Sequence, residues 1–104
     1  GMSLDGHMAT AFTNRGQAYD EQGRYYAALS DYNTAVKRDP NQVEAYGNRA
    51  GTYVRMGRYE DALADAGKAI SINPDFAEAH GNLGAAFREE FGFPENQRNL
   101  RPCR

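Results

Sequence analysis

The chain repeats itself at an interval of 34 residues. When the sequence is aligned with itself at that offset, residues 9–42 pair with residues 43–76, and twelve of the 34 positions are identical. The identical pairs are Ala11/Ala45, Asn14/Asn48, Arg15/Arg49, Tyr19/Tyr53, Gly23/Gly57, Arg24/Arg58, Tyr25/Tyr59, Ala28/Ala62, Leu29/Leu63, Asp31/Asp65, Ala35/Ala69 and Pro40/Pro74. A third copy begins at Ala77 and keeps the pattern as far as Arg88. A repeat of this length is one supersecondary unit that buries its apolar face only when copies stack, so it constrains the fold strongly.

Each repeat is predicted to be a helical hairpin. Apolar residues recur at three- and four-residue spacing on both sides of Gly57, which is the pattern of two amphipathic helices. Gly23 and Gly57 stand where the chain must reverse, because glycine adopts a positive φ without steric cost. Pro40 and Pro74 close the repeats, since proline cannot continue a helix. We therefore expect helices near residues 9–22, 25–38, 43–56, 59–72 and 77–90.

Composition supports a small helical domain and excludes several classes of protein. Twelve basic and 14 acidic residues among 104 leave a formal net charge of −2, so we expect no nucleic-acid partner, which would require a basic surface. No apolar run approaches the roughly 20 residues that cross a bilayer, so we expect no membrane association. The single cysteine, Cys103, cannot form an intrachain disulfide, which is compatible with the cytoplasmic location that we expect.

We divide the chain into three parts. Residues 1–8 are interpreted as the remnant of an expression tag, with a native disordered leader as the alternative. Residues 9–90 form the repeat domain, made of repeats 9–42 and 43–76 and the partial repeat 77–90. Residues 91–104 form a tail, because Pro94 stops a further helix and a polar stretch follows it. A longer array cut at this point would have the same sequence pattern.

Small residues and aromatics at fixed offsets identify the repeat as similar to the tetratricopeptide repeat (TPR). The matching residues are Gly16, Tyr19, Gly23, Tyr25, Ala28, Tyr32, Ala35 and Pro40, and then Ala50, Tyr53, Gly57, Tyr59, Ala62, Ala66, Ala69 and Pro74. The resemblance departs from the family at Arg15 and Arg49, which stand where a bulky aliphatic residue is usual. It implies an all-α solenoid of about two and a half repeats, with five helices stacked in a right-handed sense. The first helix of each hairpin then lines the concave surface.

Asparagine recurs once in each repeat, at Asn14, Asn48 and Asn82, on the predicted concave surface. A carboxamide has both donors and an acceptor, so it can bind the backbone of an extended peptide. The spacing resembles the asparagine ladder on the concave face of the TPR superhelix in O-linked N-acetylglucosamine transferases. The alternative is that these amides bond to neighbouring helices or to water. Thr13 and Gln17 occupy further concave positions and complete the polar part of the candidate peptide-binding set.

Three glycines stand inside predicted helices, at Gly47, Gly51 and Gly81. Each costs about 0.5–1 kcal/mol relative to alanine, so another interaction must favour it. A groove floor of bare backbone would let a bound chain approach closely. Tight contact between helices of the stack is an equally good explanation.

The best-known binding mode of TPR domains is a carboxylate clamp for the acidic C-terminal tails of chaperones. At the corresponding positions this chain has Thr13, Gln17, Asn48, Glu78 and Asn82, and only Asn48 fits the clamp. Because the clamp cations are missing and Glu78 would repel an anion, we reject this function. Four acidic residues indicate a neutral or basic peptide instead, although a solvated charged face would look the same; they are Asp20, Glu21, Glu44 and Glu78.

No pattern of catalytic or metal-binding residues is present. His80 occupies the packing position of Phe12 and Tyr46, so we expect it to be a partly buried packing residue. The single cysteine and scattered carboxylates lack metal-ligand spacing, and no glycine-rich loop carries an adjoining Lys-Ser or Lys-Thr. We therefore expect no enzyme activity, no metal and no cofactor.

The sequence thus predicts a scaffold or adaptor module that binds a protein or peptide partner in a concave groove. One alternative is self-association, a homo-oligomer formed through the end of the stack by Phe87, Phe91 and Phe93. These aromatics could instead fold back and shield the last helix. A further alternative is that the chain is a TPR fragment of a larger enzyme.

Overall fold

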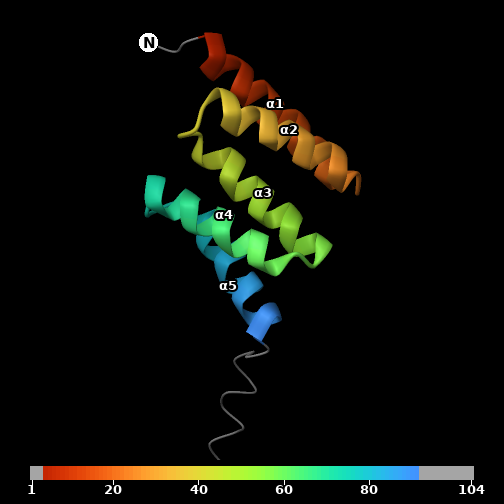
Figure 1. Cartoon of the computed structure of the whole chain (residues 1–104), viewed down its shortest axis with the longest axis vertical. Helices are drawn as coiled ribbons and strands as arrows, with labels where there is room; N and C mark the ends of the chain where they lie inside the picture. The colour runs from red at the N-terminus through yellow and green to blue at the C-terminus, as the bar shows by residue number, and fades with distance from the viewer. Residues whose placement is uncertain (1–3, 92–104) are drawn as a thin grey trace, which may run out of the picture.

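Five helices make up the computed structural model, which describes residues 4–91, with side chains described for residues 8–90 (Figure 1). They are α1 (Leu4–Glu21), α2 (Tyr25–Arg38), α3 (Val43–Met56), α4 (Tyr59–Ile72) and α5 (Ala77–Phe91), and no strand occurs within these residues. The predicted all-α fold is therefore confirmed. The largest difference is at the start of α1, which begins at Leu4 inside the segment that we expected to be a tag remnant or leader. The predicted tail lies outside the described residues beyond Phe91.

The turn inside each hairpin depends on one glycine in the left-handed conformation. Gly23 has φ +79° and Gly57 has φ +80°. After α3, Arg58 N–H donates to the Tyr53 carbonyl at 2.8 Å and Gly57 N–H donates to the Val54 carbonyl at 3.0 Å. This is the Schellman arrangement, which satisfies the last carbonyls of a helix and reverses the chain. The turn after α1 has the same pair of hydrogen bonds.

The connection between hairpins is a short proline turn that occurs twice. Asn41 N–H donates to Asp39 Oδ1 at 3.1 Å, and Asp75 N–H donates to Asn73 Oδ1 at 3.1 Å. Each carboxylate or amide oxygen thereby closes an Asx turn around the proline. The equal geometry of the two connections means that successive hairpins enter the stack in the same orientation.

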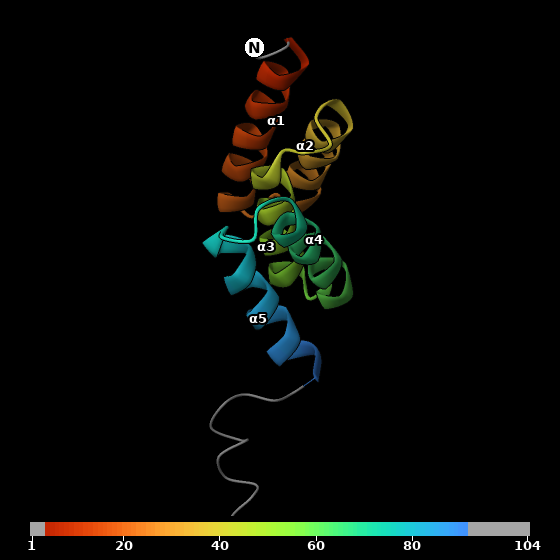
Figure 2. The same ribbon diagram turned by 90° about the vertical axis from the view of Figure 1, so that its left-hand side faces the viewer.

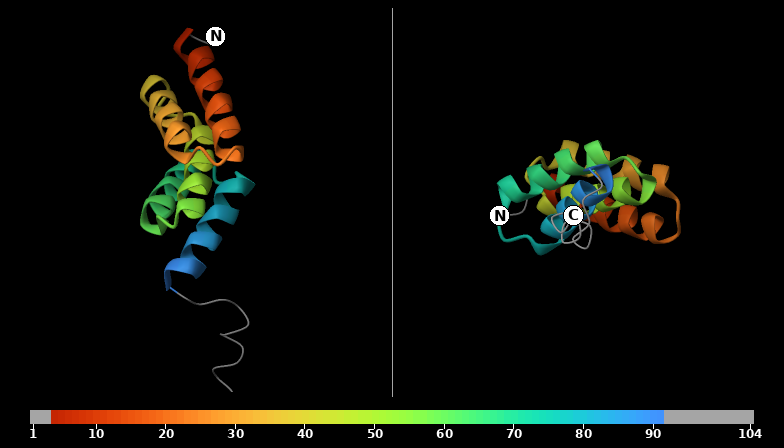
Figure 3. Two further views of the ribbon diagram at one scale, coloured as in Figure 1. Left: turned by 90° about the vertical axis from the view of Figure 1, so that its right-hand side faces the viewer. Right: turned by 90° about the horizontal axis from the view of Figure 1, so that it is seen from below.

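The five helices form an elongated stack with two sides. Figures 2 and 3 show α1, α3 and α5 on one side and α2 and α4 on the other. The first helices of consecutive hairpins contact one another, whereas α2 and α4 do not. Because the inner helices touch and the outer ones spread apart, the stack curves around the side of α1, α3 and α5. The molecule measures 59 × 28 × 16 Å along its principal axes.

Alanine and tyrosine side chains fill the interior of the stack. Four alanines that match between the repeats are fully buried, namely Ala28, Ala35, Ala62 and Ala69. Tyr19 and Tyr53 pack against a cluster of Ala28, Leu29 and Tyr32, which joins the two hairpins. Small residues allow close helix approach, and the aromatic rings fill the remaining space.

His80 is exposed, which corrects the expectation that it is partly buried. The corresponding Tyr46 is buried because α4 and α5 cover it through Ala69 and Ala79. No helix follows α5 within the described residues, so His80 has no such cover. Both side chains nevertheless make the same contact: Tyr46 donates to the Pro40 carbonyl at 3.0 Å, and His80 Nε2 lies 2.7 Å from the Pro74 carbonyl.

Candidate functional site

A cavity of about 620 Å³ opens on the side of α1, α3 and α5, and we call it the concave cavity. It crosses all three first helices, so its walls come from every hairpin. Side chains that line it include Gln17 and Glu21 of α1, Tyr32 of α2, Asn48 and Arg55 of α3 and Glu78 of α5. The walls therefore consist mainly of amide, carboxylate and phenol groups, which suits a polar chain better than an apolar ligand.

An ion pair between Asp20 and Arg55 links α1 to α3 inside the concave cavity. Arg55 Nε donates to Asp20 Oδ1 at 2.9 Å, and Arg55 Nη2 pairs with the other carboxylate oxygen. Asp20 is buried, and this hydrogen bond is the main cause that raises the pKa of Arg55. The only cation among the cavity's lining residues is thus already neutralised by a carboxylate.

Two carboxylates of the concave cavity, those of Glu21 and Glu78, form no ion pair with any residue of the described part of the chain. Although Glu78 is exposed to solvent, partial desolvation raises the pKa of its carboxyl above the ordinary value of 4.5. Among the nearby charges, Arg55 lowers this pKa, and the smaller effects of Asp20 and Glu44 raise it. The cavity therefore carries negative charge, and at Glu78 this charge is partly shielded from water.

Tyr32 lies under the concave cavity and is fully buried. Its hydroxyl and that of Thr52 have no hydrogen-bond partner within the described residues. Burial is the main cause that raises the pKa of Tyr32 to about 12; the nearby Thr52 hydroxyl and the charge of Arg55 lower this pKa, while the charges of Asp20 and Glu78 raise it. The ring rests on Gly16, where a Cβ atom would lie 2.7 Å from Tyr32 Cε1. Gly16 therefore leaves the space that the ring of Tyr32 occupies beside α1.

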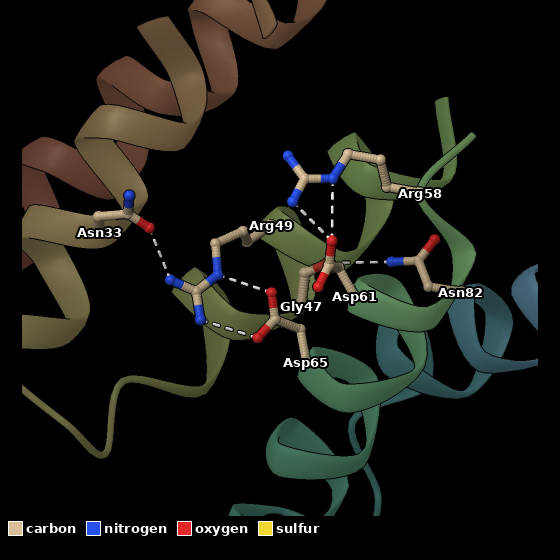
Figure 4. Close-up of polar contacts among 7 residues, drawn as sticks. All are labelled: Asn33, Gly47, Arg49, Arg58, Asp61, Asp65 and Asn82. Atoms are coloured by element: carbon tan, nitrogen blue, oxygen red, sulfur yellow. Dashed lines mark hydrogen bonds and ion pairs between the residues drawn. The ribbon is translucent and has the colours of Figure 1, made fainter. Parts of the chain in front are cut away.

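The three predicted amides have three different environments. Asn14 is exposed on α1, and Asn48 lines the concave cavity. Asn82 Nδ2 instead donates to the Gly47 carbonyl at 3.0 Å and joins α5 to α3 (Figure 4). Asn82 thus makes the helix-to-helix contact that was the alternative interpretation. Asn48 has no hydrogen-bond partner within the described residues, so its amide is available to a ligand.

The helical glycines also differ in their surroundings. At Gly47 a Cβ atom would lie 2.5 Å from Phe76 Cε2, and at Gly51 it would lie 3.3 Å from Asn82 Nδ2. Gly47 therefore makes room for Phe76 in the connection between α4 and α5, and Gly51 makes room for the side chains of Arg55 and of Asn82 on α5. At Gly81 nothing lies within 4 Å of the added atom, because α5 has no further hairpin packed on it in the described residues.

The remaining predicted residues, Thr13 and Gln17, differ in their exposure to solvent. Gln17 is exposed and lines the concave cavity. Thr13 is 3% exposed, and its hydroxyl donates to the Ala9 carbonyl at 2.9 Å. The side-chain amide of Gln42 hydrogen-bonds to Thr13 and also donates to Thr10 Oγ1 at 3.0 Å. Thr13 is thus occupied by contacts within the stack.

A repeated arginine–carboxylate pair is a feature that sequence reasoning missed. Arg49 bonds both oxygens of Asp65 within its own hairpin and Asn33 Oδ1 of the preceding one (Figure 4). Arg15 bonds both oxygens of Asp31 in the same way. All four residues are identical between repeats, so a search for charge pairs 16 residues apart could have found them.

The predicted self-association residues lie at the end of the described region. Phe87 is 52% exposed on α5. The side chain of Phe91 and all of Phe93 lie outside the described residues. Among the described residues, no group of three or more histidine, cysteine or carboxylate side chains could hold a metal ion. In the same part of the chain, no helix is long and apolar enough to span a membrane.

Comparison with known families decides the kind of repeat. Models of the tetratricopeptide repeat match residues 9–42 and 31–64, and a TPR repeat model matches residues 50–89. The chain belongs to the tetratricopeptide repeat family. Together these matches cover both complete repeats and α5 up to Glu89. A search of curated protein sequences finds no match.

Solved TPR domains have the same architecture. The first TPR domain of Spaghetti (RPAP3), bound to the HSP90 peptide SRMEEVD, is 28% identical with a TM-score of 0.80, covering 86% of this chain and 71% of that one. The first TPR domain of human RPAP3, determined by NMR, is 29% identical with a TM-score of 0.80, covering 84% and 68%. The second TPR domain of human RPAP3, in complex with the HSP70 peptide SGPTIEEVD, is 24% identical with a TM-score of 0.80, covering 86% and 74%. At that lower identity the likeness concerns the fold alone.

Proposed function

We propose that this TPR domain is a scaffold module that binds an extended peptide segment of a partner protein across the concave cavity. The observation that carries the proposal is a polar cavity of about 620 Å³ built from all three first helices. The Spaghetti domain of the same fold, at 28% identity, is described as bound to an HSP90 peptide, which supports a peptide as the ligand class. Binding to a preformed surface needs little reorganisation of the receptor.

Asn48 is the proposed central contact with the peptide backbone. Its amide lines the cavity and has no hydrogen-bond partner within the described residues, so it can donate to a peptide carbonyl and accept from a peptide N–H. Gln17 adds a second amide, and Asn14 extends the polar surface along α1. Asn82, Gly47 and Gly51 act indirectly, because they hold α5 against α3 and so set the shape of the cavity.

We do not extend the acidic ligand of the Spaghetti complex, the HSP90 peptide SRMEEVD, to this chain. An anionic tail needs cations, and the arginine in the cavity, Arg55, is paired with Asp20. Glu78 adds a negative charge on the same surface. We therefore keep the rejection of a carboxylate clamp as part of the proposal.

A selection from random displayed peptides tests the proposed function. The wild-type chain is expected to select peptides whose binding weakens about fivefold when Asn48→Ala removes one hydrogen-bonding amide. Asn41→Ala, which changes an exposed asparagine in the loop before α3, is the matched control and should leave binding unchanged. Selected peptides that bind equally to wild type and Asn48→Ala, or a selection that yields none, would contradict a peptide site at the concave cavity.

Self-association through α5 is a second candidate, favoured by the exposure of Phe87 at the end of the stack. An exposed aromatic ring on a helix that no further hairpin covers within residues 4–91 can bury apolar surface against a second copy. Sedimentation velocity over a range of protein concentrations should then show a dimer that Phe87→Asp converts to a monomer. A monomer at every concentration excludes this candidate.

A further inference from the structure

The charges of the concave cavity do not balance. The Asp20–Arg55 pair contributes no net charge, and the remaining ionisable carboxylates on its walls are those of Glu21 and Glu78. Gln17 and Asn48, which lie on the same walls, are neutral. A ligand that enters the concave cavity therefore meets two carboxylates that form no ion pair within the described residues, although Arg55 attracts Glu78 from its pair with Asp20. This charge pattern favours a positively charged group.

The position of Glu78 makes a cation more favourable than it would be on an open surface. Its carboxylate faces Asp20 and Glu44, both negative, and Arg55, whose charge is shared with Asp20. Partial desolvation of this group means that its interaction with a bound cation is less screened by water. A cation would therefore relieve the repulsion between these carboxylates, whereas an anion would increase it.

A second, independent observation concerns the buried hydroxyl of Tyr32. This oxygen lies near the Thr52 hydroxyl, which lowers the pKa of Tyr32, but neither hydroxyl makes a well-formed hydrogen bond within the described residues, and Tyr32 lines the concave cavity. It is close enough to Asp20, Arg55 and Glu78 to be influenced by all three charges. Buried polar atoms in folded proteins normally have a partner, so an unpaired phenol oxygen beside a cavity is an acceptor that a ligand can satisfy. Ammonium and guanidinium groups are strong donors to such an oxygen.

We infer that the concave cavity selects a peptide carrying a lysine or arginine side chain, whose cationic group binds against the carboxylates of Glu21 and Glu78. This inference rests on the proposed function, because it specifies the chemistry of the peptide that the same cavity binds. Asn48 and Gln17 bind the peptide backbone, and the carboxylates of Glu21 and Glu78 bind one side chain of the peptide. The domain is thus a TPR module whose preferred ligand has a charge opposite to that of the acidic tail bound by the Spaghetti domain.

Three short peptides of one alanine–serine sequence test this preference. They are capped at both ends and differ only at two central positions, which are lysine, glutamine or glutamate. Titration into the isotope-labelled full chain should shift the amide signals of Gln17, Glu21 and Glu78 with the lysine peptide. The lysine peptide should bind about tenfold more tightly than the glutamate peptide, and the difference should shrink as salt is added. A fourth peptide has glutamine at the two central positions and a free amino terminus. It shows whether the cavity binds a cationic side chain or the charged end of a chain.

Charge-changed variants decide whether the preference belongs to the concave cavity. Glu78→Lys should abolish the preference for lysine and increase binding of the glutamate peptide, and the milder Glu78→Gln should weaken lysine binding about threefold. The matched control is Glu60→Lys, which changes the net charge equally at an exposed position of α4. Circular dichroism checks that each variant folds.

The outcomes separate the inference from the proposed function. Equal binding of the three peptides, no binding of the lysine peptide, or an equal effect of Glu60→Lys and Glu78→Lys would overturn the cationic preference. Tighter binding of the free-amino-terminus peptide than of the lysine peptide would overturn it as well. In each of these cases, displayed peptides that remain sensitive to Asn48→Ala would leave the peptide-binding function standing.

Discussion

Arg49 on α3 forms two hydrogen bonds with the carboxylate of Asp65 on α4, at 2.6 Å from Nε to Oδ2 and 2.8 Å from Nη2 to Oδ1. Its third nitrogen, Nη1, donates to Asn33 Oδ1 of the preceding hairpin at 2.8 Å. One side chain therefore ties together both helices of its own hairpin and the hairpin before it. Arg49 is 16% exposed and Asp65 is 10% exposed, so water competes little with this contact.

Asp65→Ala should lower the free energy of unfolding by about 2 kcal/mol, because it leaves the largely buried guanidinium of Arg49 without its counter-charge. The matched control is Asp61→Ala. Its pair with Arg58 is 48% exposed on both sides, so its loss should cost less than about 0.5 kcal/mol. Urea denaturation of the three chains measures both values. Equal effects of the two substitutions would show that the Arg49–Asp65 pair has no special role in stability.

The same glycine-to-alanine change should have opposite effects in α1 and α5. Gly81→Ala should stabilise the domain by about 0.5–1 kcal/mol, since alanine is the better helix former and nothing lies within 4 Å of the new methyl group. Gly16→Ala should destabilise it by about 1–3 kcal/mol, because its methyl group would meet the buried ring of Tyr32 at 2.7 Å. Urea denaturation midpoints check both signs. If Gly16→Ala is also stabilising, the close contact between α1 and α2 is wrong.

Glu78→Gln should change how stability depends on pH. The pKa of Glu78 is raised in the folded chain, so the folded state binds its proton more readily than the unfolded state. The free energy of unfolding of the wild type therefore falls as pH rises through the interval above 4.5. Glutamine cannot ionise, so the variant should be more stable than wild type at pH 7, by at most about 0.5 kcal/mol because Glu78 is solvent-exposed. Urea midpoints at several pH values should converge on the acidic side; a constant difference would contradict this assignment.

Tyr32→Phe should leave stability unchanged or raise it by about 0.5–1 kcal/mol, because it removes a buried hydroxyl that has no hydrogen-bond partner. The same variant should bind the lysine peptide more weakly if that hydroxyl accepts a hydrogen bond from the ligand. Thermal unfolding and peptide titration give the two readouts. A marked loss of stability would mean that the hydroxyl has a structural partner after all.

Much of the fold was predictable because its determinants are local. Helix periodicity, the glycines that reverse the chain and the prolines that end each hairpin act over a few residues, and the 34-residue repeat showed that the pieces must stack. The predicted bounds of the four helices after α1 therefore agree with the structure to within one residue. The concave position of Asn48 was expected from the family resemblance, which implies that the first helices line the inner surface, and Asn48 lines the same cavity as Gln17.

The partners of individual side chains could not be predicted in the same way, because they depend on which residues from other parts of the stack pack against each position. Thr13, Gly47 and Gly81 occupy the same place in their repeats. Gln42 contacts Thr13 and Phe76 covers Gly47, whereas nothing lies within 4 Å of a methyl group added at Gly81. Likewise, Asn82 bonds to the α3 backbone while Asn48 does not bond to α1.

The sequence by itself determined a stack of helical hairpins with a polar inner surface. Only the tertiary structure decided which charges of that surface are paired, by bringing Arg55 against Asp20 of the preceding repeat, while Glu21 and Glu78 form no ion pair within the described residues. The physical reason is that helix formation depends on neighbours along the chain, whereas ion pairing and burial depend on neighbours in space.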